Sequence, residues 1–248
     1  MSVSVAASCA LTGAAAGALL PRVAYRLSVP AGTPVRSSCE NCDGPFPAGR
    51  AGWVRPGAPC RCTGAPGPSP WWTASAAAVC TGLLGWTTPS GPALLPFLLA
   101  AVVGVLLAAV DLRCLRLPDP LVAALAAGTV LPLAVAAVAA GEPGRVGRAG
   151  VVAVLCFGGY LLVALLPGGG LGFGDVKLAA VLGFLLGWIG WPAVLLGLAV
   201  PHLLNGPVAV FLLVTRRAGR RTALPLGPAL LAGALIAVTA TANGHTLL

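Results

Sequence analysis

The sequence predicts an all-α protein, a polytopic membrane helix bundle of about eight transmembrane helices with a cytosolic loop that contains cysteines. Of the 248 residues, 58% are hydrophobic and only 8% are charged, whereas soluble domains usually carry about 25% charged residues. The apolar residues form blocks of about 20, the helix length that crosses a bilayer. Many blocks are rich in Ala and Gly, and such small residues allow membrane helices to pack closely.

The blocks divide the chain into a first transmembrane helix within 1–20, a polar segment over 21–71 and a membrane domain over 72–248. Signal peptides carry basic residues before the apolar run, but here Arg22 and Arg26 follow it, so we expect an uncleaved helix. The polar segment has no clear periodicity and is either a small loop domain or a flexible linker. The expected helices cover residues 3–20, 72–88, 92–112, 120–140, 149–167, 176–190, 193–214 and 224–242.

The net charge of +9 would suggest a nucleic-acid partner in a soluble protein. In a membrane protein the positive-inside rule explains it better, so we expect no nucleic acid. With the N-terminus outside, only Arg145 and Arg148 fall on the outer side. We therefore expect a multi-pass protein of the plasma or inner membrane, with both termini outside. The expected cytosolic charges are Arg22, Arg26, Arg36, Arg50, Arg55, Arg61, Arg113, Arg116, Lys177, Arg216, Arg217, Arg220 and Arg221.

Three of the six acidic residues fall at the cytosolic ends of expected helices. Asp111 ends a long apolar run, where a carboxylate is costly unless it faces water or a partner. Asp175 follows a glycine-rich run, and glycines permit close approach of a peptide backbone, although a simple helix cap would also explain this aspartate. Asp119 precedes Pro120, and we interpret it as an N-cap.

Two carboxylates held together can share one proton, because like-charge repulsion raises one pKa. The ionised member then activates a water molecule, and the protonated member polarises the scissile carbonyl. A Ser-His-Asp site is a poor alternative, since the two histidines, His202 and His245, lie in apolar or terminal settings and are interpreted as structural.

Several motifs resemble one known family, the prepilin peptidases (type IV leader peptidases, A24-type intramembrane aspartyl peptidases). The run 172–178, Gly-Phe-Gly-Asp-Val-Lys-Leu, resembles the family's Gly-x-Gly-Asp-x-Lys signature. The segment 111–119 resembles its other aspartate segment. The run 224–228, Leu-Pro-Leu-Gly-Pro, resembles the Pro-Phe-Gly-Pro turn before the last helix, with Leu226 in place of the usual Phe.

The resemblance implies that residues 72–248 form a membrane aspartyl peptidase domain with Asp111 and Asp175 as the catalytic pair. Gly172 and Gly174 would support the substrate loop. Lys177, the only lysine in the chain, would position substrate or bind a lipid phosphate, and a plain positive-inside anchor is an equal alternative.

Two cysteine pairs, Cys39-x-x-Cys42 and Cys60-x-Cys62, lie in the polar segment. A reducing cytosol disfavours disulfides, so the pairs are either a Cys₄ zinc site or free thiols. The resemblance favours zinc, because bifunctional family members carry a zinc-binding domain in this loop. The single residue between Cys60 and Cys62, where the family has two, restricts how both thiolates can face one ion.

The expected activity is that of an endopeptidase which cleaves prepilin or pseudopilin leaders after a Gly at the cytosolic membrane face, serving a type IV pilus or protein secretion. By resemblance it would also methylate the new amino terminus from S-adenosylmethionine, although no local motif for that cofactor is present. Membrane lipids are the other expected partner. The alternatives are an ion-coupled transporter or channel, whose acidic site should lie near mid-membrane, and a non-catalytic pilus or secretion assembly factor.

Overall fold

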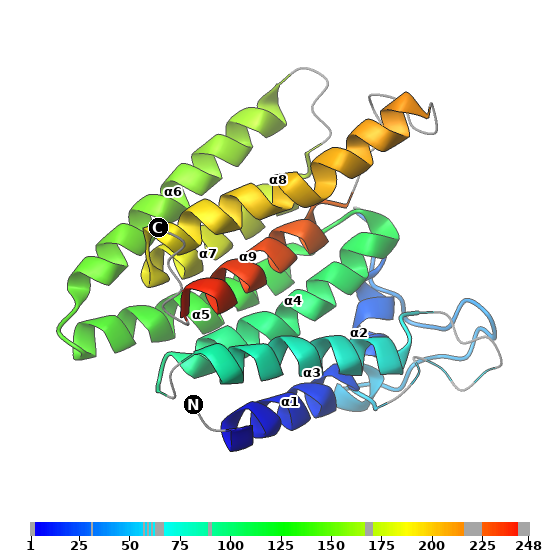
Figure 1. The fold of residues 1–248 in the computed structure, drawn as a ribbon. Coiled ribbons are helices and arrows are strands. Elements are labelled where there is room, and N and C mark those ends of the chain that lie inside the picture. The colour runs from blue at the N-terminus through cyan, green and yellow to red at the C-terminus, as the bar shows by residue number, and fades with distance from the viewer. Residues whose placement is uncertain are drawn as a thin grey trace.

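The computed structural model describes residues 3–30, 32–56, 58, 60, 62, 67–88, 91–166, 171–215 and 225–242. Within these residues the chain forms nine α-helices and one 3₁₀ turn, and its only extended pairing is an isolated bridge between Ser38 and Pro45. The all-α prediction is therefore confirmed. The helices are α1 (Val3–Gly17), α2 (Leu20–Leu27), α3 (Pro70–Thr87), α4 (Leu94–Cys114), α5 (Asp119–Ala139), α6 (Pro143–Leu165), α7 (Phe173–Ile189), α8 (Trp191–Val214) and α9 (Gly227–Ala242), shown in Figure 1.

Each of the eight predicted blocks coincides with one of these helices, but eight membrane spans are not confirmed. Four described helices, α4, α5, α6 and α8, are long and apolar enough to cross a bilayer, or five spans if α1 and α2 count as one. Helices α7 and α9 have only 17 and 16 residues, fewer than the about 20 that a full crossing requires. The chain is thus a multi-pass membrane protein with some shorter apolar helices inside the bundle.

The polar segment begins differently from the prediction, which placed loop from residue 21 onward. After α1 the chain bends by 46° and continues as the short helix α2, which buries Leu20, Arg22 and Tyr25 on one side. Eight residues span about two turns, too few for a periodicity that could be recognised in the sequence. Only Gly190 separates α7 from α8, because α7 ends at Ile189 and α8 begins at Trp191.

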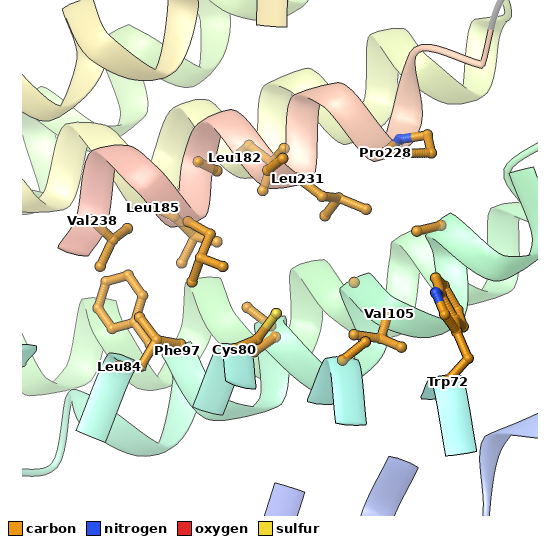
Figure 2. A pocket seen from close by; sticks show the side chains of 18 residues that line it. Trp72, Cys80, Leu84, Phe97, Val105, Leu182, Leu185, Pro228, Leu231 and Val238 are labelled. Atoms are coloured by element: carbon orange, nitrogen blue, oxygen red, sulfur yellow. The ribbon is translucent and has the colours of Figure 1, made fainter. Parts of the chain in front are cut away.

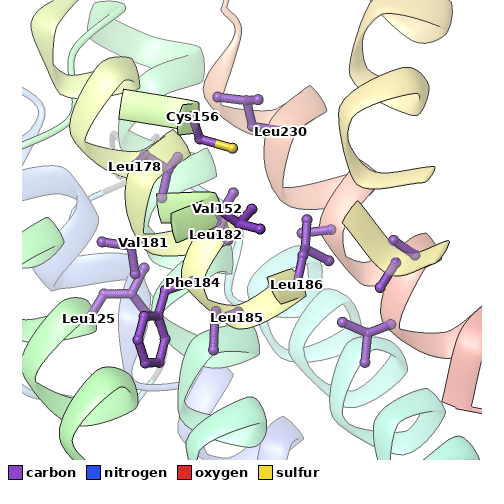
Figure 3. Close-up of a cluster of buried hydrophobic side chains, with 14 of the residues drawn as sticks. Leu125, Val152, Cys156, Leu178, Val181, Leu182, Phe184, Leu185, Leu186 and Leu230 are labelled. Atoms are coloured by element: carbon purple, nitrogen blue, oxygen red, sulfur yellow. The ribbon is translucent and has the colours of Figure 1, made fainter. Parts of the chain in front are cut away.

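Helix α7 lies at the centre of the bundle and supplies six of the 22 buried residues of the main hydrophobic cluster. Figure 3 shows Leu178, Leu182 and Leu186 of α7 among buried side chains from α5, α6 and α9. Helix α6 approaches α7 closely, since a Cβ atom on Gly183 would lie only 2.9 Å from Cys156 Sγ. The burial of α7 on many sides holds its first turn, which carries Asp175, in a fixed place.

The ends of several elements meet at one end of the bundle, on the right in Figure 1. The end of α4, the loop between α4 and α5, and the beginnings of α7 and α9 lie here, and so does the cysteine-containing loop. Arg116 Nη1 donates a hydrogen bond to the carbonyl of Pro30 at 3.0 Å, which ties the α4–α5 loop to the polar segment. The start of α1 and the end of α9 lie at the opposite end.

Candidate active site and metal centre

Asp111 lies in the last turn of α4 and is only 3% exposed. Its Oδ2 accepts a hydrogen bond from the backbone N–H of Gly227 at 3.1 Å. Gly227 is the first residue of α9, and the N-terminus of a helix carries positive partial charge that favours a carboxylate. The beginning of α9 therefore supplies both a donor and a favourable field for a carboxylate that ends an apolar helix.

Asp175 is the third residue of α7, where the helix field also favours a negative charge. The helix begins after Gly172, and the Asp175 N–H bonds the Gly172 carbonyl at 3.0 Å. The N-cap is therefore Gly172, so the alternative in which Asp175 caps α7 is wrong. Asp175 Oδ1 is buried and has no hydrogen-bond partner among the described residues, which leaves it available for a water molecule or a substrate.

The loop between α4 and α5 brings the two aspartates together. Leu115 has a left-handed conformation, with φ of 50°, and caps the end of α4 four residues after Asp111. Leu117 then lies against Gly174 of α7 and Gly227 of α9. A Cβ on Gly174 would lie 2.8 Å from Leu117 Cβ, and a Cβ on Gly227 would lie 3.4 Å from Leu117 Cδ2. Asp111 and Asp175 are consequently close enough to interact electrostatically.

A cavity of about 190 Å³ opens beside Asp175. Its walls come from the α4–α5 loop and from the glycine-rich start of α7. A Cβ on Gly172 would lie 3.2 Å from Asp175 Oδ2, so a larger residue there would crowd the carboxylate. The lining residues are Leu115, Arg116, Leu117, Asp119, Gly172, Phe173, Gly174 and Asp175.

Asp119 and Lys177 lie at the rim of this cavity and form an ion pair, with 2.8 Å between Oδ1 and Nζ. Lys177 also lies over the ring of Phe173, 4.8 Å from its centroid. The predicted N-cap role of Asp119 is wrong, because it is the first residue of α5 and the residue in the cap position, Pro118, makes no side-chain cap bond. The carboxylate of Asp119 is instead engaged by Lys177, which links α5 to α7.

A second cavity, of about 230 Å³, lies between α3 and α4 on one side and α7 and α9 on the other. Figure 2 shows that apolar side chains line it, from Leu84, Phe97 and Val238 at one end to Trp72 and Pro228 at the other. Pro228 follows Gly227, so this end of the cavity lies next to the backbone that binds Asp111. No sequence pattern predicts this cavity, because it depends on how four helices pack.

The four cysteines of the polar segment come together. All four Sγ atoms lie within 4.8 Å of one another, with 3.7 Å between Cys39 and Cys62 and 3.6 Å between Cys42 and Cys60. A tetrahedral zinc ion with Zn–S bonds of about 2.3 Å separates its sulfurs by about 3.8 Å. None of the four forms a disulfide, so this donor set can hold a metal ion.

The single residue between Cys60 and Cys62 does not prevent this arrangement. The backbone N–H of Cys62 donates to the Cys60 thiol and lowers its pKa to about 7, whereas burial raises the pKa of the Cys62 thiol to about 12, so Cys60 is the member of this pair that more readily becomes the thiolate that a metal requires. The other pair lies on a tight turn in which Asp43 N–H bonds the Cys39 carbonyl at 2.8 Å. Both pairs thus present their sulfurs to one point.

Aromatic and basic side chains attach the cysteine-containing loop to α2. Arg26 stacks over the ring of Trp53, 3.9 Å from its centroid, and Arg36 lies 4.7 Å from the centroid of Tyr25. The Tyr25 hydroxyl accepts a hydrogen bond from the backbone N–H of Glu40 at 3.0 Å. The cysteine-containing loop is therefore held on α2, which itself packs against α4 of the membrane domain.

Comparisons with known proteins agree with these features. Residues 97–210 match the model of the type IV leader peptidase family, a range that includes Asp111 and Asp175. The prepilin leader peptidase/N-methyltransferase of Burkholderia pseudomallei (strain 1026b) is 35% identical over 164 residues, covering 63% of this chain and 49% of the relative. The protein of the same name from Pseudomonas putida is 41% identical over 80 residues, covering 32% and 27%.

The chain spans about half the length of the Burkholderia relative, at 49%, and less of the one from Pseudomonas putida. No solved structure matches the chain significantly.

Proposed function

We propose that the chain, whose residues 97–210 match the model of the type IV leader peptidase family, is a membrane aspartyl endopeptidase that removes the leader of prepilin-like proteins. One observation carries this proposal. Two carboxylates from different helices, the buried Asp111 and the half-buried Asp175, lie near each other at one end of an otherwise apolar bundle, where Asp175 lines a cavity. Ionisable groups inside membrane helices are rare and usually functional.

The proposed mechanism uses the two carboxylates as a pair that shares one proton. The ionised carboxylate takes a proton from water while the water oxygen attacks the scissile carbonyl carbon, and the protonated carboxylate gives its proton to the carbonyl oxygen. A proton then passes to the leaving nitrogen as the C–N bond breaks. The Gly227 N–H fixes one oxygen of Asp111, so its carboxylate keeps one orientation through both steps.

The substrate would be a prepilin or pseudopilin whose leader ends in Gly. Gly172 and Gly174 leave room for an extended peptide beside Asp175. Apolar side chains of the helix that follows the cleavage site would occupy the apolar cavity of Figure 2, which reaches Pro228 beside the Asp111 site. The matched relatives are named as prepilin leader peptidases, which supports this class of substrate.

Co-expression with a candidate prepilin tests the proposal. Wild-type protein should remove the leader, and Asp111→Asn and Asp175→Asn should each abolish cleavage, because Asn can neither take up nor donate the shared proton. Glu142→Gln is a matched control, since Glu142 lies in the connector before α6 and pairs only with Arg145 at the surface. Robust cleavage by an inserted Asp175→Asn variant would refute the mechanism.

The position of the aspartates disfavours an ion-coupled transporter or channel. A transport site should lie near mid-membrane, whereas Asp111 and Asp175 lie at one end of the bundle, with the cysteine-containing loop. A non-catalytic assembly factor would give no cleavage with wild-type protein and every tested prepilin, so the same co-expression distinguishes it from the peptidase.

We further propose that Cys39, Cys42, Cys60 and Cys62 hold a structural zinc ion that stabilises the loop on α2. The fit of the four sulfurs to a tetrahedral ion supports this proposal. Methylation of the new amino terminus from S-adenosylmethionine is proposed only because the matched relatives are named as N-methyltransferases. Mass spectrometry of the mature product would show an added methyl group if the chain has this activity.

The proposed orientation places the site and the loop in the cytosol and both termini outside, in the plasma or inner membrane, with lipids around the bundle. The distribution of Arg and Lys supports it, although Arg61 and the Arg216–Arg221 cluster lie outside the described residues. Reporter fusions at Gly64 and Gly219, also outside the described residues, should report cytosol, and one at Gly144 should report outside. A cytosolic signal at Gly144 would contradict this orientation.

A further inference from the structure

Two buried polar atoms, one in the aspartate pair and one on the neighbouring helix α6, lack a hydrogen-bond partner among the described residues. One is Asp175 Oδ1 and the other is the hydroxyl oxygen of Tyr160 on α6. Buried polar groups are hydrogen-bonded in the great majority of cases, so an exception calls for a ligand or an ordered water. Two exceptions close to each other indicate one shared partner.

Tyr160 and Asp175 belong to neighbouring helices, and Tyr160 lines a small cavity together with Ala179, which lies one helical turn after Asp175 on the same face of α7. Helices α6 and α7 run against each other along a close seam, and Phe157 of α6 contacts Phe173 of α7 with ring centroids 6.5 Å apart. This contact fixes α6 beside the first turn of α7, one turn before Tyr160. Tyr160 therefore lies about one helical turn from the level of Asp175, on the part of α6 that packs against α7.

The space around Tyr160 is large enough for a water molecule. A cavity of about 430 Å³ between α6 and α8 is lined by Tyr160 and extends to Leu171 and Leu226. Leu171 precedes Gly172, the N-cap of the helix that carries Asp175, and Leu226 precedes Gly227, which binds Asp111. A buried water needs only about 10–15 Å³ and two to four polar partners. Tyr160 and Asp175 supply a donor and an acceptor.

The histidine that also lines this cavity does not satisfy Tyr160. His202 Nδ1 lies 2.7 Å from the carbonyl of Leu198, so it carries a proton and donates it there. The rings of His202 and Tyr160 are 6.4 Å apart at their centroids and tilted, and no hydrogen bond joins them in the described structure.

We propose that Tyr160 is a positioning residue of the peptidase site, whose hydroxyl holds Asp175 Oδ1 through one bridging water molecule. The hydroxyl donates to the water, and the water donates to Oδ1. The carboxylate is then fixed on the side of α6, as Asp111 is fixed by Gly227 on the side of α9. The inference deepens the proposed peptidase function and rests on it.

The kinetic test compares Tyr160→Phe with wild type on a prepilin-like substrate. The variant keeps the ring and loses only the hydroxyl, so kcat should fall at least about tenfold, the effect of losing one hydrogen bond to a charged group. KM should stay within about twofold, because Tyr160 holds Asp175 and not the substrate. Tyr25→Phe removes a hydroxyl from the only other tyrosine, outside the peptidase site, and should keep kcat.

The kinetic outcomes separate the inference from its alternatives. An unchanged kcat in Tyr160→Phe would overturn it. An increase in KM alone would assign Tyr160 to substrate binding and would also overturn it. A similar loss in Tyr25→Phe would mean that kcat reports general damage, and the spectroscopic result below would then decide.

A spectroscopic test does not require that the protein be a peptidase. The carboxyl C=O stretch of protonated Asp175 can be assigned in infrared spectra of purified protein by its loss in Asp175→Asn. Tyr160→Phe should shift this band to higher wavenumber, because a hydrogen bond is lost, and Tyr25→Phe should leave it in place. An unchanged band in Tyr160→Phe refutes the bridge, even if wild-type protein cleaves no prepilin.

Discussion

A single added methyl group at Gly227 should disturb the site in a way that the structure allows to be estimated. A Cβ atom at this position would lie 2.9 Å from Asp111 Oδ2 and 3.3 Å from its Cγ. Carbon and oxygen atoms in favourable contact are about 3.3–3.6 Å apart. In Gly227→Ala the carboxylate of Asp111 must therefore move by about half an ångström.

The displacement should reduce turnover more than substrate binding. A misplacement of about 1 Å can cost about 100-fold in rate, so half that distance should lower kcat about tenfold, equivalent to about 1.4 kcal/mol. KM should change little, because the glycine-rich loop and the apolar cavity are not crowded by this methyl group. The backbone at Gly227 is not left-handed, so the change introduces no strain of its own.

The assay is steady-state cleavage of a prepilin-like substrate by purified protein, with kcat and KM measured separately. Gly147→Ala is the matched control, since a Cβ there meets no atom within 4 Å and should leave kcat unchanged. Wild-type kcat in Gly227→Ala, with insertion and thermal stability unchanged, would refute the idea that this close contact fixes Asp111.

The remaining predictions concern the rim, the metal and the α6–α7 seam. Asp119→Asn should lower kcat/KM by no more than about fivefold, since its partly exposed pair with Lys177 is worth at most about 1 kcal/mol. Purified protein should contain about one zinc per chain by elemental analysis, and Cys42→Ser should lose it and speed proteolysis between residues 30 and 70. Gly183→Val should lower stability by about 1–3 kcal/mol, measured by thermal unfolding, whereas Gly150→Val, where a Cβ meets no atom, should not.

Each of these predictions has an opposite result that would count against it. If Asp119→Asn were as inactive as Asp175→Asn, the catalytic pair would include Asp119. A metal content near zero in active protein would mean that the four cysteines remain free thiols. Equal melting temperatures for Gly183→Val and Gly150→Val would show that α6 can move away from α7 at no cost.

The helices could be predicted because a backbone in lipid cannot hydrogen-bond to water. An apolar block must satisfy its own hydrogen bonds, so block length alone located every long helix. Helix α2 was missed because its burial depends on packing rather than on composition. The count of eight spans is not confirmed, because α7 and α9 are apolar yet short, and an apolar block does not reveal whether it is surrounded by lipid or by protein.

The site could be predicted in part, for the same reason. Charged residues in membrane helices are tolerated mainly at the helix ends. The orientation inferred from the distribution of Arg and Lys therefore placed Asp111, Asp119 and Asp175 on the same side of the membrane. The cap assignment of Asp119 failed because Lys177, from another helix, competes for its carboxylate. Tyr160 could not have been found, since a tyrosine in an apolar helix is usual and only the α6–α7 packing directs its hydroxyl to the site.

The contact between Asp111 and α9 matters for the stability of the fold as well as for catalysis, because the dipole of α4 opposes a negative charge at Asp111. A carboxylate in the last turn of a helix is opposed by the negative end of the helix dipole, and burial in an apolar bundle adds a desolvation cost. The N-terminus of α9 offsets both, because its first N–H bonds Asp111 Oδ2 at 3.1 Å. Asp111→Asn removes the charge and relieves these costs, so it should insert and fold at least as well as wild type. A loss of activity in that variant would then reflect chemistry and not damage to the fold.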